Sequence, residues 1–290
     1  MLRFMTTALL AACATAPLAT AEEASRGHLV LNGGGSKPDV VMEKFVELAG
    51  GPEAPIVIFP TASEEEDTGE YYQELFQQYG CKDVKVAQVA VRDDAADPEL
   101  AELVLDAGGI WFAGGDQRRI TEALLDTVVG QAVNEALAHG AVVGGTSAGT
   151  ACQSGLMITG DGDFTLLTAE NVELWEGLGL FDGVIVDQHF VARKRHNRLM
   201  SVVLEHPEML GVGVDEATAV WVRPDGTFEV LGDGWVVVFD ASQATITRAP
   251  RNRLGQPLGV QGLITHILLP GDNYDVKKRA VVIEKREDRR

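Results

Sequence analysis

A single serine lies between glycines in the segment Gly145-Thr-Ser-Ala-Gly149, directly after the apolar run Ala141–Gly144. The pattern G-x-S-x-G at the end of a strand is typical of a nucleophile elbow, a sharp strand-to-helix turn that exposes the serine hydroxyl. Glycine is needed on either side because a Cβ there would collide with the neighbouring chain. Ser147 is therefore the candidate nucleophile, and the N–H of Ala148 is a candidate donor to an oxyanion. The same glycines are also compatible with an ordinary turn of an α/β protein.

The general base that a serine nucleophile requires is best supplied by His189. The run Val184–Val186 is typical of a strand, and His189 follows at its carboxyl end in Asp187-Gln-His-Phe190. In open α/β sheets, sites form where the carboxyl ends of the strands meet. The other histidines lie at a strand start, at helix ends, in a basic stretch or in a late strand-like run. His189 is therefore the histidine that we expect beside the nucleophile.

A base of this kind must itself be oriented by a third group. The next strand-like run, Leu210–Val214, ends in Asp215 and Glu216. A carboxylate at the carboxyl end of a strand is well placed to accept the imidazole N–H, and Glu216 is the candidate. The order Ser147, His189, Glu216 differs from the order serine, acid, histidine of α/β-hydrolases. This difference argues against an ordinary esterase or lipase.

Two glycine-rich segments follow other predicted strands. Gly114-Gly115 comes after Gly109–Phe112 and is expected to bring backbone N–H groups beside the serine as the second half of an oxyanion hole, although a tight turn needs glycine equally. Gly33-Gly-Gly35 follows the first strand, but its spacing fits neither G-x-G-x-x-G nor G-x-x-x-x-G-K-[ST]. We therefore expect no nucleotide cofactor. Without H-E-x-x-H or similar ligand spacing, we expect no metal either.

Basic residues gather just after His189 in an otherwise acidic chain. Arg193, Lys194, Arg195 and Arg198 fall within six residues, whereas the formal net charge of the chain is −19. Arg195 and Arg198 are three positions apart and can share one face of a helix. Because guanidinium groups bind carboxylates in a fixed geometry, the cluster indicates one of two things: a substrate with acidic groups, or an internal ion-pair network with Asp and Glu.

The elements that must position these residues alternate between strand and helix. Strands are predicted at His28–Leu31, Pro55–Phe59, Val84–Val89, Gly109–Phe112 and Ala141–Gly144. Helices are predicted between them, at Asp39–Ala49, Thr68–Tyr79, Pro98–Asp106 and Gln117–Ala138. Such alternation is typical of βαβ units, so we predict an α/β fold of three layers, with a mostly parallel central sheet and helices on both faces. The stretch from Val220 to Ile283 has the pattern of a β-rich C-terminal extension.

The composition fits one large α/β domain, which we expect to span residues 22–290. The chain has 290 residues, of which 46% are hydrophobic and 23% charged, so it can bury a full core without a second domain. The acidic charge argues against nucleic acid or an anionic membrane surface as partner. A cationic or zwitterionic substrate fits this charge better, although a surface adapted to solubility explains the charge equally well.

The first residues have the pattern of an export signal. A positive start at Arg3 is followed by an apolar, alanine-rich stretch and by Ala19-Thr-Ala21, which is an A-x-A cleavage site. Cleavage after Ala21 would leave a secreted or periplasmic protein with no membrane attachment. Cys13 lies in a lipoprotein-like box, but its signal would be very short, so we rank lipidation below secretion. Cys81 and Cys152 are expected to be single buried thiols rather than a disulfide pair.

Four separated segments of the chain are highly specific together. They are Gly114-Gly-Asp-Gln117, Gly145-Thr-Ser-Ala-Gly149, Asp187-Gln-His-Phe190 with Arg193, Arg195 and Arg198, and Gly213-Val-Asp-Glu-Ala-Thr-Ala219. In this order they resemble the cyanophycinases, which belong to the dipeptidase E family of serine peptidases. The resemblance extends over essentially the whole mature chain and implies a fold similar to that of class I glutamine amidotransferases.

The resemblance implies a role for each matching position. Ser147 would be the nucleophile, His189 the base and Glu216 the orienting acid, while Ala148 and the Gly115–Asp116 region would donate to the oxyanion. The positions that would shape a pocket for β-aspartyl-arginine units are Gln117, Asp187, Gln188, Arg193, Arg195 and Arg198. The implied substrate is cyanophycin, multi-L-arginyl-poly-L-aspartate, and cleavage of its aspartate backbone would release β-Asp-Arg dipeptides. A homodimer is expected by resemblance as well, and the export signal points to a form that acts on released polymer.

Two other functions remain open from the sequence. One is an aspartyl dipeptidase of the same fold that acts on small peptides, and the other is a non-catalytic periplasmic peptide-binding protein. An amidotransferase proper would carry cysteine at the elbow, where this chain has Ser147. Cys152 lies five residues further along and is too far away to replace it.

Overall fold

The computed structural model describes residues 27–162 and 165–283. The predicted signal segment, its cleavage site after Ala21 and the possible lipidation site at Cys13 lie outside these residues. Export therefore stays a prediction.

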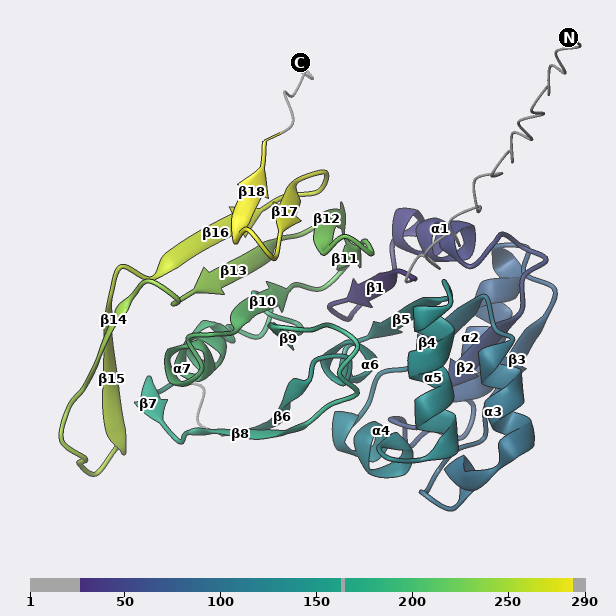
Figure 1. The fold of residues 1–290 in the computed structure, drawn as a ribbon, viewed down its shortest axis with the longest axis horizontal. Coiled ribbons are helices and arrows are strands. Elements are labelled where there is room, and N and C mark those ends of the chain that lie inside the picture. Colours follow the sequence, from purple (N-terminus) through teal and green to yellow (C-terminus); the bar gives the residue numbers. More distant parts are fainter. Residues whose placement is uncertain (1–26, 163–164, 284–290) are drawn as a thin grey trace, which may run out of the picture.

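A nine-stranded mixed sheet forms the centre of the fold (Figure 1). Five neighbouring strands are parallel, in the order β1 (Leu29–Asn32), β5 (Val142–Thr146), β4 (Gly109–Phe112), β2 (Ile56–Phe59) and β3 (Val84–Val86). Antiparallel strands extend the sheet beyond β1, in the order β11 (Thr218–Val222), β12 (Thr227–Gly232), β17 (Asn273–Asp275) and β18 (Ala280–Val282).

Both faces of β1, β2, β4 and β5 are buried, which explains why these strands are largely apolar. In β2, Ile56 and Ile58 pack in a cluster with residues of α1 (Asp39–Leu48) and α2 (Thr68–Gln78). Val57 and Phe59 point the other way and pack in a second cluster with residues of α3 (Pro98–Leu105) and α5 (Val128–Ala138). The predicted three-layer α/β arrangement is confirmed.

One predicted helix is two helices. The span expected from Gln117 to Ala138 divides into α4 (Gln117–Leu124) and α5, separated by Asp126, whose φ is +56°. The hydroxyl of Thr127 accepts a hydrogen bond from the N–H of Gly130 at 3.1 Å and so caps α5. This side chain satisfies a backbone donor that an uninterrupted helix would have used internally.

The β-rich part of the chain is confirmed and is divided among several sheets. Beside the central sheet lies a four-stranded sheet in the order β16 (Ile264–Leu268), β13 (Val236–Asp240), β10 (Leu210–Val214) and β9 (Val184–Asp187). The hairpin of β14 (Thr245–Arg248) and β15 (Gln256–Gln261) projects from this end of the molecule and pairs with β7 (Thr168–Ala169) (Figure 1). The remaining elements are β6 (Leu156–Gly162), β8 (Val172–Glu176), α6 (Ala148–Ala151), α7 (His196–Glu205) and a 3-10 turn at Asp94–Ala96.

Three further expectations concern cysteines, membranes and metals. Cys81 and Cys152 are buried free thiols, as predicted. Within residues 27–162 and 165–283, no helix has the length and apolar content to cross a bilayer. The same residues contain no cluster of three or more His, Cys, Asp or Glu side chains that could hold a metal ion.

Candidate active site

Ser147 lies at a strained turn between β5 and α6. Its φ is +54° and its ψ is −110°, a combination that side-chain-bearing residues rarely adopt and that the surrounding structure must hold in place. The flanking glycines make this possible, because a Cβ at Gly145 would lie 2.3 Å from the carbonyl oxygen of Gly149. A Cβ at Gly149 would lie 2.2 Å from the carbonyl oxygen of Phe112. The segment therefore has the geometry of a nucleophile elbow.

Three side chains from distant parts of the chain form a hydrogen-bonded row at this turn. The Oγ of Ser147 lies 2.8 Å from Nε2 of His189, and Nδ1 of His189 lies 2.6 Å from Oε1 of Glu216. The side chain of His189 is 8% exposed, whereas that of Glu216 is 41% exposed. With Nδ1 donating to the carboxylate, Nε2 is the ring nitrogen that can accept the serine proton.

The loop after β1 binds the backbone of all three segments. Three consecutive carbonyl oxygens accept hydrogen bonds from the elbow, from the base and from the residue after Glu216. The N–H of Ser147 donates to the carbonyl of Asn32 at 3.0 Å, that of His189 to Gly33 at 2.7 Å, and that of Ala217 to Gly34 at 3.0 Å. Each of the three segments is thus bound to one of three consecutive peptide groups, which sets the positions of the segments relative to one another.

The side chain of Asn32 strengthens this connection. It is fully buried, and its Oδ1 accepts hydrogen bonds from the hydroxyl of Thr146 and from the N–H of Gly34, both at 2.9 Å. Its backbone carbonyl also accepts from the hydroxyl of Thr150 at 2.7 Å. Asn32 therefore ties the start of the loop to both sides of the elbow.

The glycines of this loop are required by close approach of the other two segments. A Cβ at Gly33 would lie 2.2 Å from the carbonyl oxygen of Asp215, and a Cβ at Gly34 would lie 2.2 Å from Cε1 of His189. Gly35, with φ of +67°, lies against the side chain of Glu216. The Gly33–Gly35 segment matches no nucleotide motif. It instead forms the backbone surface against which the base and its carboxylate partner pack.

Of the predicted oxyanion donors, some have an N–H that is free within the described residues, and one already donates to a backbone carbonyl. The N–H of Ala148 begins α6, and among the described residues neither it nor the N–H of Gly115 donates to a protein acceptor. The N–H of Asp116 donates to the carbonyl of Ala62 at 2.9 Å, and its carboxylate binds Arg118. The expectation that Asp116 contributes a donor is therefore corrected, since its N–H is already used.

The basic residues after β9 serve two different purposes. Arg198 is fully buried and binds the fully buried carboxylate of Asp187 with two nitrogens, Nε at 2.9 Å and Nη2 more closely. Neither side chain is accessible to a ligand, so the direct substrate contact predicted for this pair is not what the structure provides. They correspond to the alternative of an internal ion pair.

The other two arginines of this cluster lie nearer the solvent. Arg193 is exposed, and Arg195 is 9% exposed. Nη1 of Arg195 donates to the carbonyl of Gln188 at 2.7 Å, while its Nε is buried without a hydrogen-bond partner in the described residues. Burial lowers the pKa of Arg195 to about 10, and the nearby charge of Arg198 contributes to the shift.

Gln117 and Gln188 differ in whether their side-chain amide groups are hydrogen-bonded. The Nε2 of Gln117 donates to the carbonyls of Ile158 and Thr159, each at 2.7 Å, which fixes the start of α4 to β6. The Oε1 of Gln188 is buried, and no donor to it is found within the described ranges. The Oε1 of Gln188 is therefore an acceptor buried beside the base, whereas the Gln117 amide nitrogen is already bound.

The electrostatic surroundings keep the base neutral. Burial is the largest effect and lowers the pKa of His189 below its ordinary value of 6.5. The hydrogen bond and charge of Glu216 oppose this shift, whereas the positive charges of Arg193 and Arg195 add to it. His189 is therefore a proton acceptor around neutral pH, as a general base must be.

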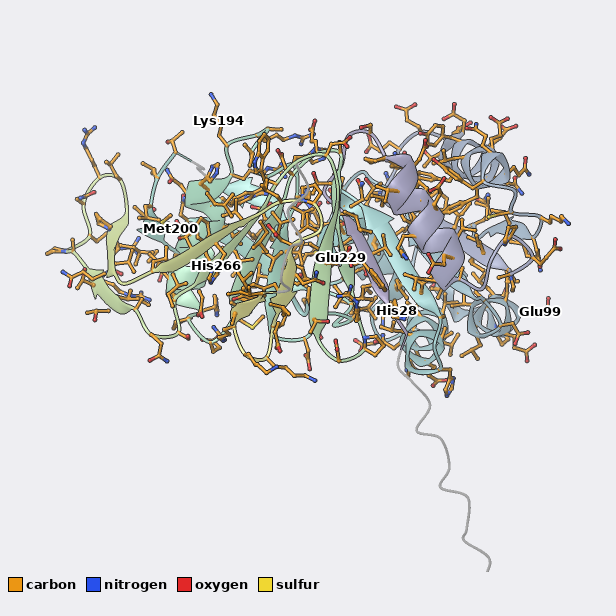
Figure 2. The ribbon with its side chains drawn as sticks, turned by 90° about the horizontal axis from the view of Figure 1, so that it is seen from above. His28, Glu99, Lys194, Met200, Glu229 and His266 are labelled. Atoms are coloured by element: carbon orange, nitrogen blue, oxygen red, sulfur yellow. The ribbon has the colours of Figure 1, made fainter. Side chains whose placement is uncertain are left out.

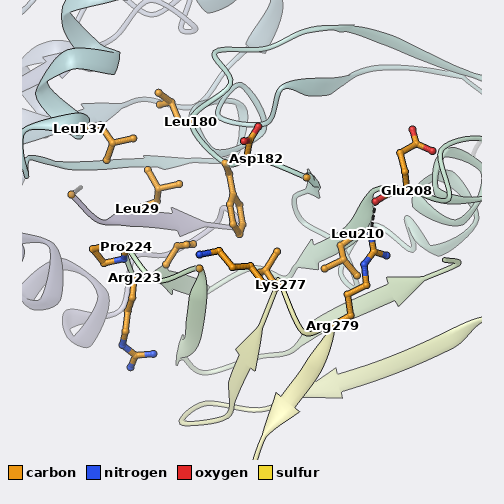
Figure 3. Close-up of a pocket in the computed structure, with 16 residues that line it drawn as sticks. Leu29, Leu137, Leu180, Asp182, Glu208, Leu210, Arg223, Pro224, Lys277 and Arg279 are labelled. Atoms are coloured by element: carbon orange, nitrogen blue, oxygen red, sulfur yellow. Dashed lines mark hydrogen bonds between the residues drawn. The ribbon is translucent and has the colours of Figure 1, made fainter. Parts of the chain in front are cut away.

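A large cavity lies elsewhere and is not part of this site. It has a volume of about 600 Å³ and is lined by the first residues of β1 and β10, Leu29 and Leu210, with Phe181 and Lys277 (Figure 3). These positions are at the amino ends of the strands, opposite the elbow. In Figure 2, His28, which precedes β1, marks the side of the molecule at the amino ends of the strands. Lys194, five residues after His189, lies on the opposite side.

Asp215 is a site residue that the sequence analysis did not assign. Its Oδ1 accepts hydrogen bonds from the N–H groups of Val191 and Ala192, at 3.1 and 2.9 Å, and so holds the loop that carries His189 and Arg193. Its position next to Glu216 was the available signal. Two adjacent carboxylates at one strand end cannot both contact the same imidazole, so one of them must have another partner.

Comparison with known families places this geometry in context. Residues 29–230 of the chain match the family described as peptidase family S51. The match contains Ser147, His189 and Glu216 together with the loop after β1.

Curated relatives are similar over most of the chain. A cyanophycinase from Synechococcus elongatus is 34% identical over 273 residues, covering 91% of this chain and 85% of the relative. A cyanophycinase from Geminocystis herdmanii is 37% identical over 239 residues, covering 82% of this chain and 88% of the relative. The crystal structure of a peptidase from an acI-B1 Actinobacterium has a TM-score of 0.62 and 25% identity, covering 85% of this chain and 98% of that one.

The buried pair of Asp187 and Arg198 predicts a large effect on stability. Asp187→Ala leaves the guanidinium of Arg198 buried without its carboxylate, so we expect the free energy of unfolding to fall by about 3–5 kcal/mol. Urea denaturation measures the change. Arg193→Ala is the control, because its side chain is exposed, and should stay within about 0.5 kcal/mol of the wild type. A fall of under about 1 kcal/mol for Asp187→Ala, typical of an exposed pair, would contradict the structural role.

Proposed function

This chain belongs to peptidase family S51 and is a serine-type peptidase, and from that premise we propose that it hydrolyses cyanophycin to β-Asp-Arg dipeptides. The observation that carries the proposal is the hydrogen-bonded row of Ser147, His189 and Glu216. The names of the relatives support the substrate, and the charges around the base support a ligand that carries both signs.

The proposed reaction begins with attack of the Ser147 hydroxyl on a carbonyl of the aspartate backbone. His189 accepts the proton at Nε2, while Glu216 holds the ring and stabilises the imidazolium that forms. The oxygen of the tetrahedral intermediate accepts hydrogen bonds from the N–H groups of Ala148 and Gly115, which have no other acceptor among the described residues. His189 then protonates the leaving amine, and water hydrolyses the acyl-enzyme by the same steps.

Substrate binding is assigned to the side chains that remain available at this edge. The exposed guanidinium of Arg193 suits the carboxylate of a β-Asp-Arg unit, and the charge of the more deeply placed Arg195 adds to the attraction. Asp187 and Arg198 support this surface from beneath rather than by contact. The export signal predicted at residues 1–21 would direct the enzyme to polymer outside the cytoplasm.

The proposed substrate is tested by incubating the purified protein with cyanophycin and detecting β-Asp-Arg by mass spectrometry. Release of the dipeptide supports the proposal. If small aspartyl peptides are cleaved and the polymer is not, the enzyme is an aspartyl dipeptidase of the same family. If neither is cleaved although peptide binds, the protein is a binding protein on this fold.

Replacement of the nucleophile should separate chemistry from folding. We expect Ser147→Ala to lower kcat by on the order of 10⁴-fold or more, because no acyl-enzyme can form. Its free energy of unfolding should stay within about 0.5 kcal/mol of the wild type, since alanine occupies the same turn. Ser242→Ala, at an exposed serine after β13, is the matched control and should keep full activity. Turnover by a clean Ser147→Ala preparation would remove Ser147 from this role.

The pH profile should report the lowered pKa of His189. Activity requires the neutral imidazole, so kcat/KM is present above this pKa and is lost as the pH falls through it. We therefore expect the acid limb to lie below 6.5, the ordinary value for histidine. Arg193→Gln removes a positive charge that lowers the pKa, so its limb should move to higher pH.

Lys194→Gln provides the control for this measurement. Lys194 is also exposed but is not among the groups that shift the pKa of His189. Its removal should leave the limb where the wild type has it. Equal shifts for both variants would show a general effect of net charge, and no shift for Arg193→Gln would contradict the assigned electrostatics.

A further inference from the structure

A second pocket opens at the same edge of the sheet as Ser147. It has a volume of about 630 Å³ and lies between the start of α2 and the carboxyl ends of β2 and β3. Four glutamates line it, with one arginine at its side: Glu64, Glu65, Glu66, Glu70 and Arg119. The lining is therefore strongly acidic.

The negative charge of this pocket is poorly compensated. Among the described residues its one ion pair joins Glu64 and Arg119 at 3.7 Å, with the Glu64 side chain 89% exposed. Within the described part of the chain, Glu65, Glu66 and Glu70 form no ion pair or side-chain hydrogen bond. Three carboxylates thus remain available to a cationic ligand.

The lining of the pocket includes a buried polar group without a partner. Thr61 lines the pocket and is 4% exposed, and no described residue hydrogen-bonds to its Oγ1. A buried hydroxyl normally has a partner, since leaving it unpaired costs free energy. An N–H donor that enters the pocket would supply that partner.

The pocket lies within reach of a substrate bound at Ser147. The elbow follows β5, and the pocket begins at β2, with β4 between them. Neighbouring strands are about 4.8 Å apart, so the ends of β5 and β2 are separated by roughly 10 Å. Ala62, next to Thr61, joins the loop after β2 to the loop after β4, because its carbonyl accepts the N–H of Asp116 at 2.9 Å.

We infer that this acidic pocket binds the guanidinium group of a second arginine of the polymer while another unit lies at Ser147. The inference rests on the proposed function, because a substrate with regularly spaced arginines is what gives the pocket a ligand. An extended backbone advances about 3.3–3.6 Å per residue, so roughly 10 Å corresponds to about three units. The three free carboxylates provide the charge, and the Thr61 hydroxyl accepts a guanidinium N–H. The pocket therefore favours long polymer over short fragments.

The test compares polymer with a two-unit fragment, (β-Asp-Arg)₂, in a variant that neutralises the pocket. We expect the triple variant Glu65→Gln, Glu66→Gln, Glu70→Gln to raise KM for cyanophycin roughly three- to tenfold, as loss of two or three exposed ion pairs implies. Its kcat on polymer and its kcat/KM on the fragment should equal those of the wild type. The KM of the wild type should rise with salt more steeply than that of the variant.

The matched control removes the same number of charges from the opposite edge. Glu47, Glu53 and Glu135 are exposed and precede β2 or β5, at the amino ends of the strands. Their triple replacement by Gln should leave KM for polymer unchanged. Thr61→Val, which removes the hydroxyl at nearly constant volume, should raise KM for polymer and leave the fragment unaffected.

The possible results separate the two proposals. If the wild type releases no β-Asp-Arg from polymer, the proposed function fails. If it does, but both triple variants change KM equally, the effect belongs to net charge and the pocket inference is wrong. The inference is also overturned if the pocket variant keeps the wild-type KM on polymer, or if it loses activity equally on polymer and fragment.

Discussion

Three consecutive peptide carbonyls at the end of β1 hold the site together. Asn32, Gly33 and Gly34 accept hydrogen bonds from the backbone of Ser147, His189 and Ala217. The three segments come from two different sheets, since β5 belongs to the central sheet and β9 and β10 to the four-stranded one. Because the three acceptors are consecutive in the chain, they hold the three segments close enough for the side chains of Ser147, His189 and Glu216 to form hydrogen bonds. This explains why the loop consists of glycines, because any side chain would occupy the space of the imidazole or of the strand end.

A second constraint is the charge buried beneath the loop that carries the base. Asp187 and Arg198 are both fully buried, and an ion pair in this setting is retained only with good geometry, because desolvation of the two groups is costly. The pair connects the end of β9 to α7, so it restrains both ends of the loop that lies between these two elements. Asp215 then holds the middle of the loop through two N–H groups. His189 itself has a φ of +47°, which these restraints must maintain.

The sequence predicts features formed by neighbouring residues better than features that depend on pairing between separate segments of the chain. The parallel strands are recognisable because they are largely apolar, and the elbow because five adjacent residues carry its geometry. The break at Asp126 was missed because α4 and α5 are both helical, and only the cap at Thr127 marks the boundary. The split of the β-rich part among three sheets depends on pairing between strands that are not neighbours in the chain, such as β13 with β16.

For the site, the candidate residues were identified by type and spacing, but their partners were not. Arg193, Arg195 and Arg198 have the same side chain, and a pattern of basic residues cannot tell which of them faces the interior. Burial decides this: Arg198 meets a carboxylate in the core, whereas Arg193 stays in solvent near the base. The N–H of Asp116 could not be excluded as a donor either, because its acceptor, Ala62, is 54 positions away in the sequence.

The distribution of charge in this acidic chain has a consequence for catalysis. Four of its cations lie within six residues beside the base, and four glutamates line the pocket beyond Ala62. The positive charges of Arg193 and Arg195 disfavour a second positive charge on His189 and thereby keep it ready to accept a proton. In the proposed complex a substrate carboxylate binds Arg193, which neutralises part of that unfavourable field, so the imidazolium formed during attack becomes easier to accommodate. Binding of a carboxylate-bearing unit and activation of the serine are thus electrostatically linked, which favours turnover of the substrate that fills the site over hydrolysis of one that does not.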